Sequence, residues 1–234
     1  MYKQTTHQKN QINIINQIEK QIKDNLLGFS TVAPIEDYEN DTRLCLTSVH
    51  LPNSTLIKQI SNQIITPLKK IEPHFYWYKP TSQHLTIKNI KVINDPPHFS
   101  ETDIDKVETV FSRVVLKYKS FQIYFYRLLL FPNNLALIGT TDPTLDAIIS
   151  DLNHELKVID IPDDKVYINR SYFFSNMTLC RFNSKISQKF RDKVKIISDS
   201  IRWQPYTIDS ITLLSCNAVL EKKRIINTWN LKLL

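Results

Sequence analysis

Two short segments of the chain repeat one pattern of residue types that could carry out acid–base chemistry on a phosphate group. The first is His84-Leu85-Thr86-Ile87, the second is Asn176-Met177-Thr178-Leu179, and their leading residues lie 92 positions apart. Imidazole is the side chain best suited to proton transfer near neutral pH, and threonine hydroxyls can donate hydrogen bonds to phosphate oxygens. Each segment also follows an aromatic triplet, so the repetition predicts two similar lobes that face each other across a cleft.

Both segments have the alternation of a β-strand, in which every second side chain points to the same face. A single pattern of this kind is more often an ordinary half-buried strand, but the second copy favours a shared site. The side chains predicted to share the two polar faces are His84, Thr86 and Lys88 in the first segment and Asn176, Thr178 and Cys180 in the second.

Strand-like and helix-like segments interleave in the rest of the chain, without glycine-rich turns between them. This order predicts an α+β fold with largely antiparallel sheets. We expect helices over about 54–68, 100–114, 143–152 and 186–197, and strands near 44–51, 83–92, 121–128, 134–139, 207–215 and 224–231, with one more within 165–182.

The first 41 residues differ in composition from the remainder, being polar and rich in asparagine, glutamine and lysine. Ile15, Ile18, Ile22 and Leu26 recur at helical spacing, which predicts one amphipathic helix that ends near Gly28. We therefore divide the chain into a helical extension and connector (1–41) and a two-lobed domain (42–234).

The overall composition is that of a globular protein, with 42% hydrophobic residues and a formal net charge of +7 among 234 residues. The positive excess favours partners that carry phosphate, although it equally fits a basic surface without that role. Only two glycines are present, 111 positions apart. Two glycines so far apart exclude both a Walker-type phosphate-binding loop and a Rossmann dinucleotide-binding motif. Any bound phosphate is therefore held mainly by side chains.

Several sequence features that the chain lacks indicate the cellular compartment in which we expect the protein. The three cysteines, Cys45, Cys180 and Cys216, have no metal-ligand spacing, which favours a reducing compartment and no bound metal. No apolar run is long enough to span a membrane, and the first residues lack the apolar region of a secretory signal. We expect a cytoplasmic monomer that does not bind membranes.

These features resemble the 2H phosphoesterase superfamily, which includes RNA 2′,3′-cyclic phosphodiesterases, also called 2′-5′ RNA ligase-like proteins. The family carries two H-x-[ST]-aliphatic motifs, and the first stands here as His84 to Ile87. In the second motif Asn176 replaces the histidine, while Arg181 matches a basic residue that commonly follows. The resemblance runs from Arg43 to the C-terminus. It implies a bilobal fold with two mainly antiparallel sheets that flank a central cleft and with helices outside.

The resemblance also implies a reaction that needs neither a metal nor a cofactor. In the family one histidine is the general base and the other the general acid, and the Ser/Thr pair holds the phosphate. A carboxamide such as that of Asn176 cannot exchange a proton at neutral pH, and losing one acid–base partner costs roughly 10²–10⁴ in rate. If the protein is an enzyme, His84 must therefore carry the chemistry nearly alone.

Three functions remain open on the sequence. The first is hydrolysis of RNA ends or nucleotides with 2′,3′-cyclic or 2′-5′ phosphodiester bonds, and the second is nucleotide or RNA binding without turnover. In the third, residues 1–41 supply the activity through a partner helix. The tyrosines of the site could stack on a base, although aromatic clusters are more often core. The predicted catalytic set is His84, Thr86, Asn176 and Thr178, and the predicted substrate-binding set is Lys88, Tyr76, Tyr78, Tyr172 and Arg181.

Overall fold

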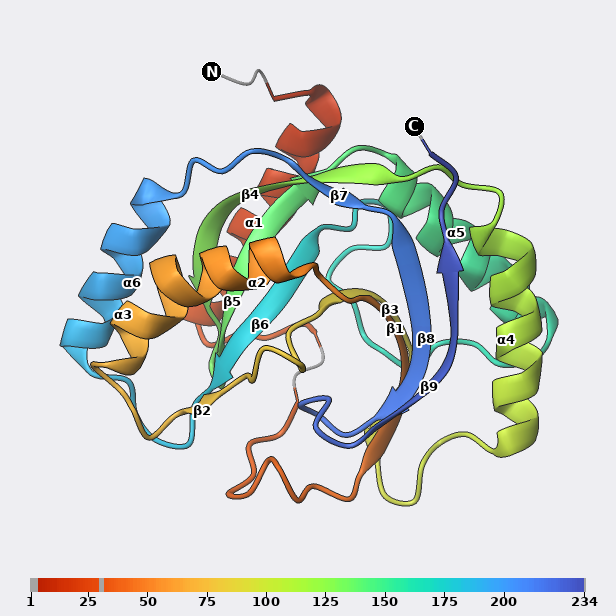
Figure 1. Cartoon of the computed structure of the whole chain (residues 1–234), viewed down its shortest axis with the longest axis horizontal. Coiled ribbons are helices and arrows are strands. Elements are labelled where there is room, and N and C mark those ends of the chain that lie inside the picture. Colours follow the sequence, from red (N-terminus) through yellow and green to blue (C-terminus); the bar gives the residue numbers. More distant parts are fainter. Residues whose placement is uncertain (1–3, 30–31, 234) are drawn as a thin grey trace.

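The protein is built from two antiparallel sheets with helices packed around them (Figure 1). The computed structural model describes residues 4–29 and 32–233. Sheet A has the strand order β3-β1-β8-β9 and sheet B the order β2-β6-β5-β4-β7. The strands of sheet A are β1 (Leu44–His50), β3 (Leu85–Asn94), β8 (Ser210–Cys216) and β9 (Lys223–Asn230). Those of sheet B are β2 (Tyr76–Trp77), β4 (Phe121–Leu130), β5 (Asn134–Thr141), β6 (Ser175–Arg181) and β7 (Tyr206–Ile208).

The helices lie where the apolar periodicity predicts them, apart from small shifts at their ends. They are α1 (Thr6–Lys23), α2 (Ser54–Ile60), the π-helical turn η1 (Ser61–Ile65), α3 (Thr66–Lys69), α4 (Glu101–Val115), α5 (Thr144–Val158) and α6 (Gln188–Ser200). The predicted cap of α4 is present, since the Ser100 side chain accepts from the backbone of Asp103 and the Asp103 carboxylate accepts from Ser100. The predicted α+β fold with antiparallel sheets is confirmed.

Two expectations about single elements are wrong. The strand predicted over 207–215 is two strands, because β7 pairs with β4 in sheet B while β8 pairs with β1 in sheet A. The chain thus crosses from one sheet to the other around Asp209. The first helix ends at Lys23 rather than near Gly28, since Asn25 adopts a left-handed conformation with φ 55°.

The largest apolar cluster joins both sheets to their outer helices. Helix α4 contacts β9 and α5 contacts β3 of sheet A, whereas α6 contacts β4 of sheet B and α3 packs against α6. Helix α1 lies apart from these, on the opposite face of sheet B, where Ile14, Ile15 and Ile18 contact Ala136 and Ile138 of β5. Figure 1 shows this helix behind sheet B, with α2 and α3 in front.

Candidate functional site

His84 lies immediately before β3, and its ring is buried, with 8% of the residue surface exposed. Its Nδ1 is 2.8 Å from the carbonyl oxygen of Ser82. Because a carbonyl oxygen only accepts, Nδ1 carries the proton of the neutral ring and Nε2 keeps its lone pair. Burial lowers the pKa of His84 to about 4. The neutral ring therefore presents Nε2 as a base rather than as an acid at neutral pH.

The two predicted segments come together where sheet A approaches sheet B. Residues of β3 and β6 lie within 8 Å of each other between Cα atoms. Thr86 is on β3, Asn176 and Thr178 are on β6, and all three are half-buried. Within the described parts of the chain no hydrogen bond engages their side chains. Two hydroxyls and one carboxamide are thus free to bind a ligand.

A bulge in β6 brings Arg181 to the polar face of the strand. Cys180 pairs with Leu135, whereas Thr178 pairs with the next residue of β5, Ala136, so one extra residue of β6 is accommodated between them. Cys180 accordingly packs in the main apolar core, which corrects the expectation that it shares a face with Thr178. The residue after it, Arg181, turns to the side of Thr178.

The guanidinium of Arg181 is buried, and no carboxylate among the described residues pairs with it. Nε donates to the hydroxyl of Tyr78 at 3.0 Å, and one terminal nitrogen donates to the carbonyl of Ala218 at 3.2 Å. A guanidinium has five N–H donors, so most of its capacity remains for an acceptor. The positive charges of Arg181 and Lys223 also add to the lowering of the His84 pKa. This corner of the site is suited to an anion.

Lys88 departs from the predicted arrangement. It pairs with Ser48 across the sheet, whereas Thr86 pairs with Val49. Since consecutive residues of β1 point to opposite faces, Lys88 does not share the face of Thr86. Its amino group is fully buried and lies 2.5 Å from the carboxylate of Asp163. The positive charge of Lys88 is thus neutralised within the fold.

The three tyrosines predicted to bind substrate occupy different surroundings. Tyr78 is buried, and its ring centroid is 6.0 Å from that of His84. Tyr76 is half-buried and donates its hydroxyl to a glutamate of the β8–β9 loop. Tyr172 packs against α1, with its ring centroid 5.6 Å from that of His7. Tyr78 is therefore the tyrosine that lies beside the imidazole.

Helix α1 covers part of the face of sheet B that carries the second motif. Asn176 pairs with Ile138 and Thr178 with Ala136, and directly opposed residues of neighbouring strands share a face. The isoleucines of α1 pack on those same two β5 residues. The N-terminal helix thus lies beside Asn176 and Thr178, which themselves stay partly exposed.

The segment 32–41, here called the connector, continues this cover from α1 to β1. The ring of Tyr38 lies 5.5 Å from the guanidinium carbon of Arg181, and Tyr38 is 2% exposed. Its backbone oxygen accepts from Asn217 at 3.2 Å, while its buried hydroxyl has no partner among the described residues. The connector therefore shields the guanidinium from solvent.

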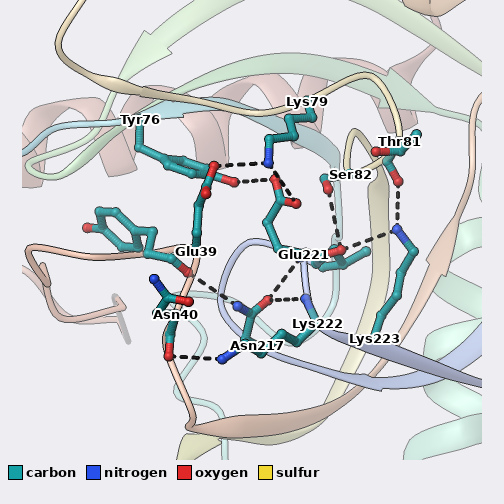
Figure 2. A network of polar contacts seen from close by, with 12 residues as sticks. Glu39, Asn40, Tyr76, Lys79, Thr81, Ser82, Asn217, Glu221, Lys222 and Lys223 are labelled. Atoms are coloured by element: carbon teal, nitrogen blue, oxygen red, sulfur yellow. Dashed lines mark hydrogen bonds and ion pairs between the residues drawn. The ribbon is translucent and has the colours of Figure 1, made fainter.

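Figure 2 shows how the next residues of the connector meet the loops around the site. Glu39 lies 2.9 Å from the amino group of Lys79, which also lies 3.3 Å from Glu221. Tyr76 donates to the other oxygen of Glu221 at 2.7 Å. The run 221–224 is thus part of a polar network that joins the connector to both sheets.

Sequence reasoning missed three contributors to this region, namely Tyr38, Ser82 and Lys223. Lys223 donates to the backbone oxygens of Thr81, which lies before β3, and of Leu220, in the loop between β8 and β9. No motif marks these residues. Tyr38 and Lys223 act through contacts with segments distant in sequence, and Ser82 acts through its backbone oxygen, which every residue type has. Two surface cavities, of about 340 and 830 Å³, include no residue of the predicted catalytic set, although Lys223 lines the smaller one.

Comparison with solved structures places this arrangement among known folds. The chain is similar to TT0787 of Thermus thermophilus, with 11% identity and a TM-score of 0.52, over 82% of this chain and 98% of that one. It is also similar to E. coli LigT complexed with 3′-AMP, with 13% identity and a TM-score of 0.51, over 81% and 98%. A third structure, described as a phosphoesterase, has 13% sequence identity and a TM-score of 0.53, over 81% of this chain and 99% of that one. The chain has the LigT-like 2H phosphoesterase fold.

At these identities the similarity is one of fold. No protein-family model and no curated protein sequence matches the chain. Among the described residues, no group of three or more histidine, cysteine, aspartate or glutamate side chains could hold a metal ion. No helix in the described ranges is long and apolar enough to cross a lipid bilayer.

Proposed function

We propose that the cleft between β3 and β6 binds the phosphate of a nucleotide or of an RNA end. The observation that carries the proposal is Arg181, a buried guanidinium without a carboxylate partner among the described residues. A phosphate would supply the missing counter-charge through charge-assisted hydrogen bonds. The free hydroxyls of Thr86 and Thr178 lie on the two strands that flank the cleft and would complete the set of donors.

The choice of ligand is supported by the shared fold. Structures of E. coli LigT complexed with phosphate and with 3′-AMP have TM-scores of 0.50 and 0.51 to this chain. A nucleotide with a terminal phosphate is therefore the first ligand to test. The net charge of +7 agrees with an anionic partner.

The chemistry that fits this cleft is opening of a 2′,3′-cyclic phosphate by water. Nε2 of His84 would take a proton from the water as its oxygen bonds to phosphorus, and the bond to one ribose oxygen would break. That leaving oxygen needs a proton, and the carboxamide of Asn176 has none to give at neutral pH. Solvent would have to supply it, so we expect turnover roughly 10²–10⁴ slower than with a second histidine.

Binding without turnover is the second candidate, and one observation favours it. Two side chains of the predicted substrate-binding set, Tyr172 and Lys88, have a proton that could replace the missing acid, but both are engaged elsewhere. Tyr172 packs on His7 of α1, and Lys88 is paired with Asp163. The cleft would then bind terminal phosphates without hydrolysing them.

Two measurements test the proposal. Calorimetric titration with 3′-AMP should show binding that Arg181→Gln weakens by about 10–100-fold, whereas the exposed Arg202→Gln leaves it unchanged. Hydrolysis of 2′,3′-cyclic AMP and of a short RNA with a cyclic end, in EDTA, then separates the two candidates. Turnover that disappears in His84→Ala supports the hydrolytic function, and binding without turnover supports the binding function. Absence of both binding and turnover contradicts the proposal.

A further inference from the structure

Two of the three cysteines meet in the fold although 171 positions separate them. Cys45, near the start of β1, and Cys216, at the end of β8, are direct partners in the antiparallel ladder. Their sulfur atoms lie 3.4 Å apart, and Cys45 is the less buried residue of the pair. Cys180, by contrast, is buried in the main core on another sheet.

The backbone geometry of this pair suits a covalent bond between the sulfurs. Directly opposed residues of antiparallel strands have Cα atoms about 4.5–5.5 Å apart, which lies within the range of about 4.4–6.8 Å seen in disulfides. The sulfurs must close from 3.4 Å to the bond length of about 2.05 Å. Rotation of the two side chains can supply that movement within the existing strand pairing.

The two thiols are also chemically unequal. The hydrogen bond between them lowers the pKa of Cys45 and raises that of Cys216, and the positive charge of Arg181 adds to the lowering. Burial raises the pKa of Cys180 far above the usual value. Since the thiolate is the nucleophile, Cys45 is the cysteine poised to react first.

We propose that Cys45 and Cys216 form a reversible disulfide when the protein meets a small-molecule disulfide such as oxidised glutathione. The Cys45 thiolate attacks one glutathione sulfur, so a mixed disulfide forms and one glutathione leaves as its thiolate. Cys216 then loses its proton and displaces the second glutathione from Cys45. Both released thiolates take up protons, so two protein thiols are oxidised and one glutathione disulfide is reduced to two glutathione molecules.

The position of the pair gives the bond a structural consequence. Cys45 lies on β1 just beyond the connector, and Cys216 directly precedes Asn217. The carboxamide of Asn217 donates to the backbone oxygen of Tyr38 at 3.2 Å, and its oxygen accepts from the backbone of Glu221 at 3.0 Å. The disulfide would therefore tie the end of the connector to the loop on which the connector docks. This inference does not depend on the proposed ligand.

Intact-mass measurement on the folded full chain tests it. The protein is incubated with mixtures of oxidised and reduced glutathione and quenched with acid. The intact mass is measured on one portion, and a second portion is alkylated and digested. We expect the mass to fall by two hydrogen atoms and a cross-linked peptide to contain Cys45 and Cys216, while Cys180 remains alkylated. Excess reduced glutathione should restore all three thiols. The cross-link should raise Tm by roughly 4–8 °C.

Three variants complete the test. Cys180→Ser should oxidise as the parent does, and Cys45→Ser should lose the internal bond. Cys216→Ser should stop at a glutathione adduct on Cys45, because no second thiol can displace it. A parent protein that accumulates only glutathione adducts, forms a cross-link through Cys180, or keeps three free thiols while folded would overturn the proposal, whatever the variants do.

Discussion

The guanidinium carbon of Arg181 lies 5.5 Å from the centre of the Tyr38 ring, so a side chain of the N-terminal connector covers the cation of the cleft. The same guanidinium carbon also lies 5.9 Å from the centre of the Tyr78 ring. An aromatic ring stabilises a desolvated cation without neutralising its charge. The structure therefore holds Arg181 in a shielded state that a phosphate could still neutralise.

Shortening Tyr38 should expose this cation to ligand. We expect Tyr38→Ala to tighten 3′-AMP binding by about 5-fold, because the phosphate no longer competes with a ring contact worth about 1 kcal/mol. Titration calorimetry measures the change. Tyr38→Phe is the matched control, since it keeps the ring and removes only a buried hydroxyl that lacks a partner among the described residues. Equal affinities for all three proteins would show that the connector does not guard the cleft.

Restoring an acid at the second motif should raise turnover. Asn176→His places an imidazole on the half-buried face of β6, where it can protonate the leaving oxygen. We expect kcat for 2′,3′-cyclic AMP to increase by about 10²–10⁴ over the parent. The double variant Asn176→His with His84→Ala should lose that gain. A rate that does not change in Asn176→His would mean that residue 176 does not reach the leaving group.

His84 should make the protein sensitive to acid. Its pKa is about 4 in the folded state and near 6.5 in the unfolded chain, so the unfolded state binds more protons between these values. The free energy of unfolding should therefore fall as the pH drops from about 6.5 to 4, by about 3 kcal/mol from this group. Urea unfolding at several pH values checks it, and His84→Gln should lose that part of the slope. NMR titration of the parent must place the pKa well below 6, or the burial argument fails.

The buried ion pair of Lys88 should be essential to stability. Removing the charge of Asp163 leaves a fully buried ammonium without its partner, and breaking such a pair costs about 3–5 kcal/mol. Asp163→Asn should therefore lower the urea midpoint sharply. Asp160→Asn is the control, since Asp160 is exposed and has a left-handed φ of 60° that asparagine tolerates. Similar midpoints for the two variants would count against the pair.

Helix α1 should contribute to the stability of the whole protein. Ile15 is fully buried between α1 and β5, so Ile15→Ala should cost about 2–5 kcal/mol in the free energy of unfolding. Ile196→Ala, at a position 62% exposed on α6, should cost less than about 0.5 kcal/mol. Circular dichroism in urea reports both. An unaffected midpoint in Ile15→Ala would mean that the packing of α1 on β5 does not contribute to the stability of the protein.

Much of the fold could be predicted from local patterns in the sequence. The capping serine of α4 and the apolar period of α1 each depend on neighbouring residues, whose effects are local. The cleft could be predicted only in part. The expectation that Cys180 lies beside Thr178 fails because alternation assumes a regular strand, and a bulge depends on how β5 and β6 pair.

Residue patterns alone predict the antiparallel α+β class, most of the helices and strands, and the two repeated segments that begin at His84 and Asn176. Long-range packing instead determines that Tyr38 covers Arg181, that Asp163 neutralises Lys88, and that Cys45 meets Cys216. The difference arises from distance along the chain. Backbone periodicity is set within a few residues, whereas these contacts depend on strand register and packing between segments tens to hundreds of residues apart.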